Sequence, residues 1–318
     1  MNEFSAIRAW SHGVRFLMAR PGQHAILLIG LGLIVPFAIQ LGAQYALTGV
    51  LFGRVAQTDT GLAWSLVPAV AVAFQAGAFF ASWRLGIGEG ETLGGALRYG
   101  LIAGLVAALA AVLLIVLAGL AASQAGSPAI GLFVFLFTLA PVILLLALFS
   151  TLAAALIGIG VAAMMAIAML TSVATGNMGM AATMVGGSGF VVVLLLVLSV
   201  LMIWLAARFS CATAIMADGK SYNPIAAARA SWELTWDEQW RIMLYLAALG
   251  TILVVLLVAG LAAIGAAAAQ GTGPEVPRAA GVIFGLGFAL LLYPLAVMVP
   301  AGIYRQMIGD RTPVEVFA

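Results

Sequence analysis

The chain has 318 residues and a net charge of +2, and 64% of its residues are hydrophobic while only 8% are charged. A soluble domain carries roughly 25% charged residues, so this composition excludes an ordinary water-soluble protein, whose surface needs more charge. The basic residues are scattered, which argues against a nucleic-acid partner. The single cysteine, Cys211, excludes an internal disulfide and a cysteine-based metal cluster.

The first 24 residues predict an amphipathic helix at the membrane surface. Apolar residues recur at three- and four-residue spacing at Phe4, Ile7, Trp10, Val14 and Leu17. The opposite face carries Arg8, His12 and Arg15. This pattern is typical of a helix that lies in the interface. The apolar run that follows is longer than that of a signal peptide, so we expect it to remain as the first span.

The rest of the chain predicts an all-α, polytopic transmembrane helix bundle. Its apolar runs have about the 20 residues that a bilayer core requires of a helix, and they lack the alternation of barrel strands. We expect about eight spans, with a range of about six to eight. They cover residues 25–47, 62–85, 97–122, 130–149, 152–170, 190–208, 242–268 and 281–304. Residues 130–170 are ambiguous, because they could form two spans, one long tilted helix or a re-entrant hairpin.

Charge placement predicts the orientation. Most basic residues fall before the first span, after the second, around the polar segment 208–241 or at the C-terminus, and only Arg54 and Arg278 fall on the other side. Positive residues stay on the cytoplasmic face, so both termini should be cytoplasmic. Residues 130–170 must then cross the membrane an even number of times.

An internal repeat is a further expectation within a single integral membrane domain, 1–318. Residues 83–89 (WRLGIGE) resemble residues 304–310 (YRQMIGD), and a looser copy begins at Arg208. Three copies would cover 4–90, 91–219 with an inserted hairpin at 130–170, and 221–310. The copies keep one orientation, unlike the inverted repeats of many transporters. Glycine spacing at Gly100 and Gly104, and at Gly281, Gly285 and Gly287, favours close helix contacts.

The polar segment 218–241 contains a predicted helix start at Asn223, where an N-cap side chain precedes Pro224. Trp232, Trp236 and Trp240 recur every four residues, so we expect them on one helical face. Such a stripe is typical of a helix at headgroup depth, and packing against neighbouring spans is the alternative.

A family resemblance rests on this segment. Its residues are Arg208-Phe209-Ser210, Asp218-Gly219-Lys220, Ala226 to Arg229, Ser231-Trp232-Glu233-Leu234-Thr235 and Trp240-Arg241, with Phe16-Leu17 to Pro21-Gly22 near the N-terminus. They resemble the membrane domain attached to some glycerophosphoryl diester phosphodiesterases and the related YciC-like bacterial inner-membrane proteins. The resemblance implies a bacterial inner-membrane protein, and little settled biochemistry comes with it.

No catalytic constellation is visible in the sequence, so we expect neither enzymatic activity nor a cofactor or metal. Phosphodiesterase catalysis in the soluble partner of that family uses paired histidine and carboxylate ligands, whereas this chain has only His12 and His24. All acidic residues fall outside the expected spans, which weakens the case for an ion-coupled transporter. The polar side chains at membrane depth are Gln40, Gln75 and Thr138, and Gln40 and Gln75 could bond across a helix pair.

Three hypotheses follow. The first is a non-enzymatic scaffold, assembly or envelope-maintenance protein with a membrane-protein partner. The second is a transporter or channel for an apolar or lipidic solute. The third is a protein that handles an anionic phospholipid at arginines gathered on the cytoplasmic face. The candidate headgroup contacts are Arg84, Arg208, Arg229 and Arg305, and the candidate interfacial anchors are Trp10, Trp83, Trp232, Trp236 and Trp240.

Overall fold

The computed structural model describes residues 3–48, 61–88, 90–123, 189–269 and 275–309. Every regular element in these ranges is a helix, which confirms the all-α prediction. In chain order they are α1 (Ala6–Met18), α2 (Pro21–Ala25), the π-helical η1 (Ile26–Ile34), α3 (Val35–Thr48), α4 (Gly61–Ile87), α5 (Leu93–Ser123), α9 (Gly189–Arg208), α10 (Ala212–Asp218), α11 (Pro224–Leu234), α12 (Gln239–Ala269) and α13 (Glu275–Ile308).

Several described helices are long and apolar enough to cross a membrane, so this is a membrane protein by length and composition. Five segments meet that condition, namely Pro21–Ala43, Val70–Ile87, Ser199–Asp218, Gln239–Ala267 and Ala279–Ile308, and Leu93–Leu109 is a shorter apolar stretch. The spans expected at 130–149 and 152–170 and the side chain of Thr138 lie outside the described residues. The total of about eight therefore stays a prediction.

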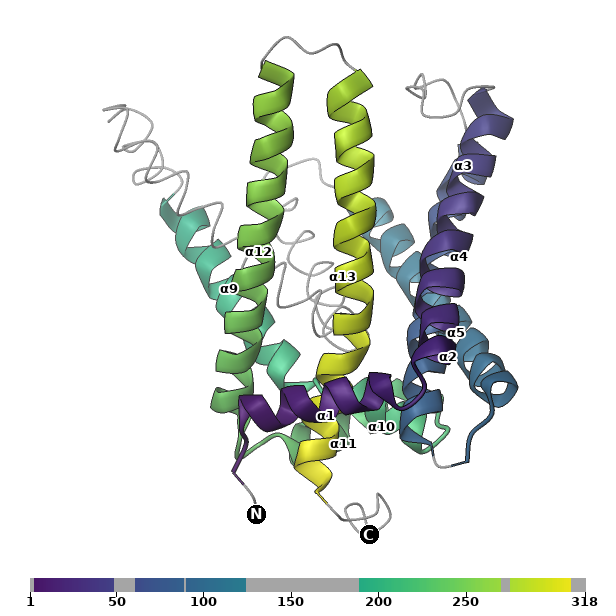
Figure 1. Ribbon diagram of the computed structural model, residues 1–318. Helices are drawn as coiled ribbons and strands as arrows, with labels where there is room; N and C mark the ends of the chain where they lie inside the picture. Colours follow the sequence, from purple (N-terminus) through teal and green to yellow (C-terminus); the bar gives the residue numbers. More distant parts are fainter. Residues whose placement is uncertain (1–2, 49–60, 89, 124–188, 270–274, 310–318) are drawn as a thin grey trace.

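The long helices run along one another, and three short helices lie across one end of them (Figure 1). We name these three helices, α1, α10 and α11, the basal layer. The first helix and the end of α13 meet there, so both ends of the described chain lie on the same side. Apart from Arg278, near the start of α13, the described basic residues belong to the basal layer or to the segments that enter and leave it.

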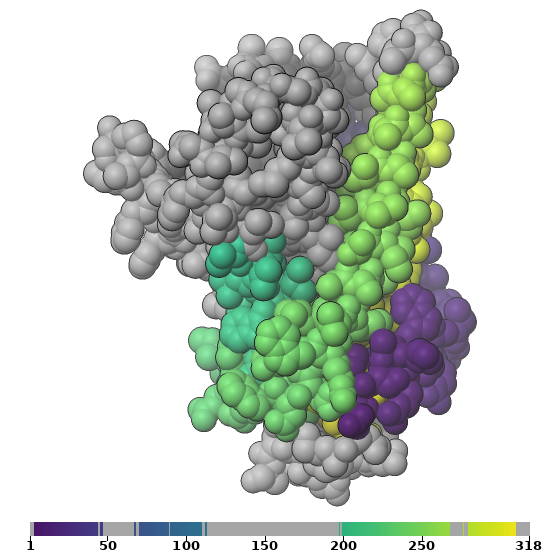
Figure 2. Space-filling view, turned by 90° about the vertical axis from the view of Figure 1, so that its left-hand side faces the viewer, coloured from purple at the N-terminus to yellow at the C-terminus, as the bar shows by residue number. Residues whose placement is uncertain are grey.

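Helix α1 packs on α13 through small residues, and its predicted position at the membrane surface stays a prediction. Its buried residues are Ala9, Gly13 and Phe16, whereas the Ile7 side of the predicted stripe is open, with Ile7 81% exposed. A Cβ atom at Gly302 would meet the carbonyl oxygen of Ala9. The backbones of α1 and α13 can approach this closely because Gly13 and Gly302 carry no side chain. In Figure 2, α1 lies against the lower end of α12.

The α4–α5 pair is also held by glycines. A Cβ atom at Gly100 would meet the backbone of Gly77, and one at Gly104 would meet the backbone of Ala73. The predicted role of this spacing in close helix packing is therefore confirmed. At Gly281, Gly285 and Gly287 a Cβ atom would have no described atom within 4 Å, so the same expectation stays a prediction there.

The core is densest where the long helices reach the basal layer. Among its large, fully buried side chains are Trp83, Phe80, Arg208 and Tyr304. The indole of Trp83 donates a hydrogen bond of 2.9 Å to the carbonyl oxygen of Val297, which joins the end of α4 to α13. A buried arginine in this core needs its own explanation, because charged groups are buried only at a cost.

Candidate functional site

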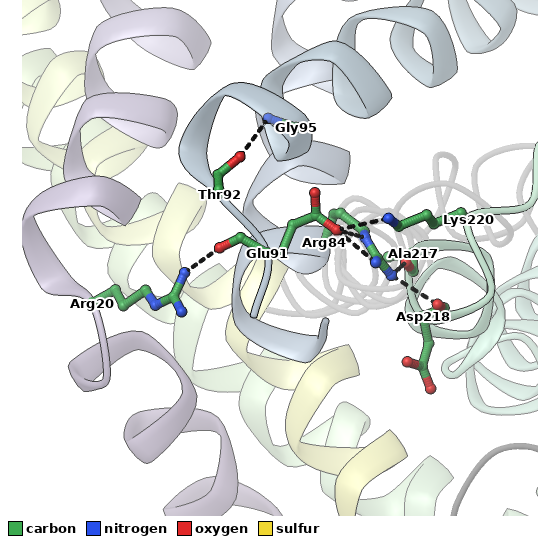
Figure 3. Close-up of polar contacts among 8 residues, drawn as sticks. All are labelled: Arg20, Arg84, Glu91, Thr92, Gly95, Ala217, Asp218 and Lys220. Atoms are coloured by element: carbon green, nitrogen blue, oxygen red, sulfur yellow. Dashed lines mark hydrogen bonds and ion pairs between the residues drawn. The ribbon is translucent and has the colours of Figure 1, made fainter. Parts of the chain in front are cut away.

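Arg84, in the last turn of α4, is the centre of a polar cluster at the basal end (Figure 3). Its Nε donates to Glu91 Oε2 at 2.7 Å, and its Nη2 lies 2.6 Å from the same oxygen. Its Nη1 donates to the carbonyl oxygens of Ala217 and Asp218, each at 2.8 Å. Ala217 and Asp218 end α10, so the guanidinium caps carbonyls that the helix leaves without internal partners. A cation is also favoured at that negative end of the helix dipole.

Glu91 gathers three basic residues. Lys220 Nζ lies 3.2 Å from its Oε2, and Arg20 donates to its backbone carbonyl at 2.6 Å. Burial on its own raises the pKa of Glu91, but the hydrogen bonds and charges of Arg84 and Lys220 outweigh it, so the pKa lies below its ordinary value. Lys220 has a positive φ of 50°, a conformation that a lysine rarely adopts.

Two tyrosines hold the turn that follows α10. Tyr304 of α13 donates to Asp218 Oδ2 at 2.7 Å, and Tyr99 of α5 donates to the carbonyl oxygen of Ser221 at 3.0 Å. The turn 218–221 is thus held by α4, α5 and α13. We call Arg84, Glu91, Asp218, Lys220 and Tyr304 the Arg84 cluster. The charged groups of the cluster pair with one another and with carbonyl groups at a helix end. Such an arrangement holds the connected segments together and is typical of a structural contact.

Arg208, the last residue of α9, has a different environment. It is fully buried, and its guanidinium carbon lies 4.1 Å from the ring centroid of Trp232 and 4.6 Å from that of Trp236. Its Nε, Nη1 and Nη2 are all buried and have no hydrogen-bond partner among the described residues. Its backbone carbonyl, in contrast, accepts hydrogen bonds from Ser231 Oγ at 2.8 Å and Thr235 Oγ1 at 3.2 Å. The backbone is fixed, while the charged group has only aromatic contacts.

The tryptophan stripe is not on one helix, which corrects the sequence interpretation. Helix α11 ends at Leu234 and α12 begins at Gln239, so Trp236 lies in the turn between them. Thr235, the residue after α11, donates through its hydroxyl to the carbonyl oxygens of Ser231 and Arg208. Trp232 therefore faces Arg208 from a helix, and Trp236 faces it from a turn.

The other candidate arginines and anchors lie apart from these groups. Arg229 is exposed and pairs with Glu233 one turn later at 3.1 Å. Arg305 is exposed and donates to the carbonyl oxygen of Gly86 at 3.0 Å. Of the candidate anchors, Trp10 and Trp240 are exposed, whereas Trp83 is 1% exposed and belongs to the core. The four arginines thus contact different partners and do not form a single anion site.

The polar residues at membrane depth do not pair with each other. Gln75 of α4 donates to the hydroxyl of Tyr293 on α13 at 2.8 Å, whereas Gln40 is exposed on α3. Apolar grooves lie on the surface of the described helices. One is lined by α4 and α5 residues such as Phe74 and Leu105, and another by α1, α12 and α13 residues such as Trp10. Neither glutamine lines them.

The histidines show no metal site. His24 is buried, with Nδ1 2.6 Å from the Ser82 hydroxyl, and His12 lies on the basal face of α1. Burial first, and then Arg15, Arg305 and Arg8, lower the pKa of His12. Within the described ranges, no group of three or more histidine, cysteine or acidic side chains could hold a metal ion.

Sequence reasoning missed Glu91, Tyr304 and Tyr99 as parts of this region. Glu91 was counted only among the acidic residues outside the expected spans. Tyr304 belonged to the repeat at residues 304–310, where interfacial anchoring explained it equally well, and Tyr99 was not singled out. Comparison of the chain with protein-family models, curated proteins and solved structures finds no match. The family resemblance therefore stays a prediction.

Proposed function

We propose that this protein is a non-enzymatic scaffold of a bacterial inner membrane, with both termini in the cytoplasm. The observation that carries the proposal is the Arg84 cluster. Its ionic and hydrogen bonds tie α4, the 88–92 loop, the turn after α10 and α13 to one another. A layer fixed in this way can hold the ends of the spans in register and present a constant surface to a partner.

The orientation proposal is supported by the position of the positive charges. The basal layer and its adjoining segments hold the described basic residues except Arg278. A face enriched in arginine and lysine stays in the cytoplasm during insertion. The bacterial inner membrane follows from the family resemblance and from this charge distribution.

A docking surface for a membrane-protein partner is available on α11. Ile225 is 80% exposed, and it precedes the exposed Arg229 by one helical turn. An apolar residue beside an ion-paired arginine on a rigid helix suits a protein contact at the membrane surface, because binding there orders little of the chain.

The test is photocrosslinking in native membranes with a photoreactive amino acid at Ile225. We expect one discrete protein adduct, recovered in fixed proportion after mild detergent extraction. The same amino acid at Ile283 of α13, which is 71% exposed, serves as the matched control and should capture lipid. Arg84→Gln should reduce the Ile225 adduct, while Arg98→Gln, which changes an exposed arginine of α5, should leave it unchanged. Lipid adducts alone at both positions would contradict the scaffold proposal.

A further inference from the structure

The Arg208 guanidinium lacks the partners that a buried arginine normally has. An arginine has five N–H donors and cannot lose its charge in a protein. The faces of the Trp232 and Trp236 indoles attract a cation, but they are not conventional acceptors for hydrogen bonds from its N–H groups. Leaving buried donors unsatisfied carries their full desolvation cost. The site is therefore built for an anionic acceptor that the protein does not itself supply here.

The nearest acidic residues along the chain are committed elsewhere. Glu233 pairs with Arg229 at 3.1 Å, and Glu238 pairs with Arg241 at 3.2 Å. Asp237 follows Trp236 and is exposed. None of the ion pairs among the described residues includes Arg208. The open acceptor position is thus not filled by a neighbouring carboxylate.

We propose that Arg208 binds the phosphate group of an anionic phospholipid. The planar fork of a guanidinium matches two oxygens of a phosphate at once. Arg208 ends α9 at the basal end of the bundle, the side on which the described basic residues other than Arg278 gather. Negatively charged lipid is attracted to such a face. This inference is independent of the scaffold proposal, because it concerns a lipid and not a protein partner.

The indole of Trp236 covers the proposed phosphate site at Arg208. The indole is 56% exposed, although its inner face lies over the buried guanidinium. It belongs to the turn between α11 and α12, so it can swing outward without unwinding either helix. Trp232 is half-buried and packs edge-on against Trp204 and obliquely against Phe209. Trp232 therefore stays in place beside Arg208 when Trp236 moves outward.

The experiment measures lipid retained on the full chain by native mass spectrometry. The protein is released from nanodiscs that contain equal parts of phosphatidylglycerol and phosphatidylcholine. Wild type should retain phosphatidylglycerol in preference to phosphatidylcholine. Arg208→Gln should lower the retained phosphatidylglycerol about tenfold, as expected for the loss of one charged two-point contact. Arg229→Gln, which removes an exposed arginine from the same layer, should retain as much as wild type.

A second variant protects the test against a folding failure of Arg208→Gln. Trp236→Ala keeps the charge and removes the cover, so retention of phosphatidylglycerol should rise about threefold. Equal retention by wild type and a folded Arg208→Gln, or no rise in Trp236→Ala, would overturn the site. Inorganic phosphate added to protein that still retains phosphatidylglycerol separates the two sources of phosphate. Displacement of phosphatidylglycerol by millimolar inorganic phosphate would overturn the lipid assignment, and its persistence would support it.

Discussion

The hydroxyl of Tyr304 donates a hydrogen bond of 2.7 Å to the carboxylate of Asp218, which lies 86 residues earlier in the chain. Tyr304 is fully buried in α13, and Asp218 ends α10. The backbone carbonyl of the same aspartate accepts from Arg84. One residue thus joins the ends of α4, α10 and α13, and removing any of its contacts should loosen all three.

Tyr304→Phe should therefore lower stability by about 1–3 kcal/mol, because the Asp218 carboxylate loses a buried donor. The measurement is the apparent melting temperature of the purified protein in one detergent. Tyr45→Phe, at an exposed tyrosine of α3, is the control and should melt with wild type. Equal melting of Tyr304→Phe and Tyr45→Phe would show that the hydrogen bond contributes nothing.

Acid should weaken the Arg84 cluster through Glu91. The folded-state pKa of Glu91 is depressed, so its stabilising contribution is complete above the unfolded-state pKa of about 4.3. That contribution is lost as the pH falls from there through the folded-state pKa. Melting temperatures measured from pH 7 to pH 3 should decline less steeply at the acid end in Glu91→Gln than in wild type. Parallel profiles for the two proteins would contradict this role.

Gly302→Ala should destabilise the docking of α1 on α13. The new methyl group would meet the carbonyl oxygen of Ala9 and lie 3.1 Å from the Gly13 nitrogen, and overpacking of this kind costs about 1–3 kcal/mol. Gly285→Ala lies on the same helix in open space and should be neutral or slightly stabilising. Limited proteolysis near α1, compared between the two variants, would report the loss of docking. Equal cleavage would exclude close packing at Gly302.

The N-cap of α11 gives a local test. The Asn223 side chain accepts from the backbone N–H groups of Ile225 and Ala226, each at 3.1 Å. Asn223→Ala should cost about 1 kcal/mol, and Asn223→Asp should keep most of the stability, since both asparagine and aspartate cap well. Thermal unfolding of the two variants checks the difference. A loss of the same size in both would assign the effect to something other than the cap.

Local signals in the sequence predicted the helices well. The start of α11 at Asn223-Pro224 is confirmed, because the N-cap and the following proline act within four residues of each other. The apolar runs likewise predicted the described long helices. The length of these apolar runs is set by the thickness of the bilayer, and it does not depend on which neighbouring helices pack against them.

Contacts between distant segments were not predictable in the same way. The tryptophan stripe failed because the chain leaves the helix after Leu234, so that Trp236 lies in the turn before α12. The packing of α1 on α13 was not predicted, because it depends on the small residues Ala9 and Gly13 meeting Gly302 of a distant helix. The separate environments of Arg84 and Arg208 also depend on partners more than 100 and more than 20 residues away, respectively.

The packing of α1 on α13 has a consequence for biosynthesis. The ribosome makes α1 long before the surface that receives it, which includes Met298 and Gly302 of α13. Until α13 has been inserted, α1 can only rest on the bilayer, as an amphipathic segment does. Docking of α1 therefore cannot precede the insertion of α13, and a nascent chain that stalls before α13 leaves α1 accessible to proteases.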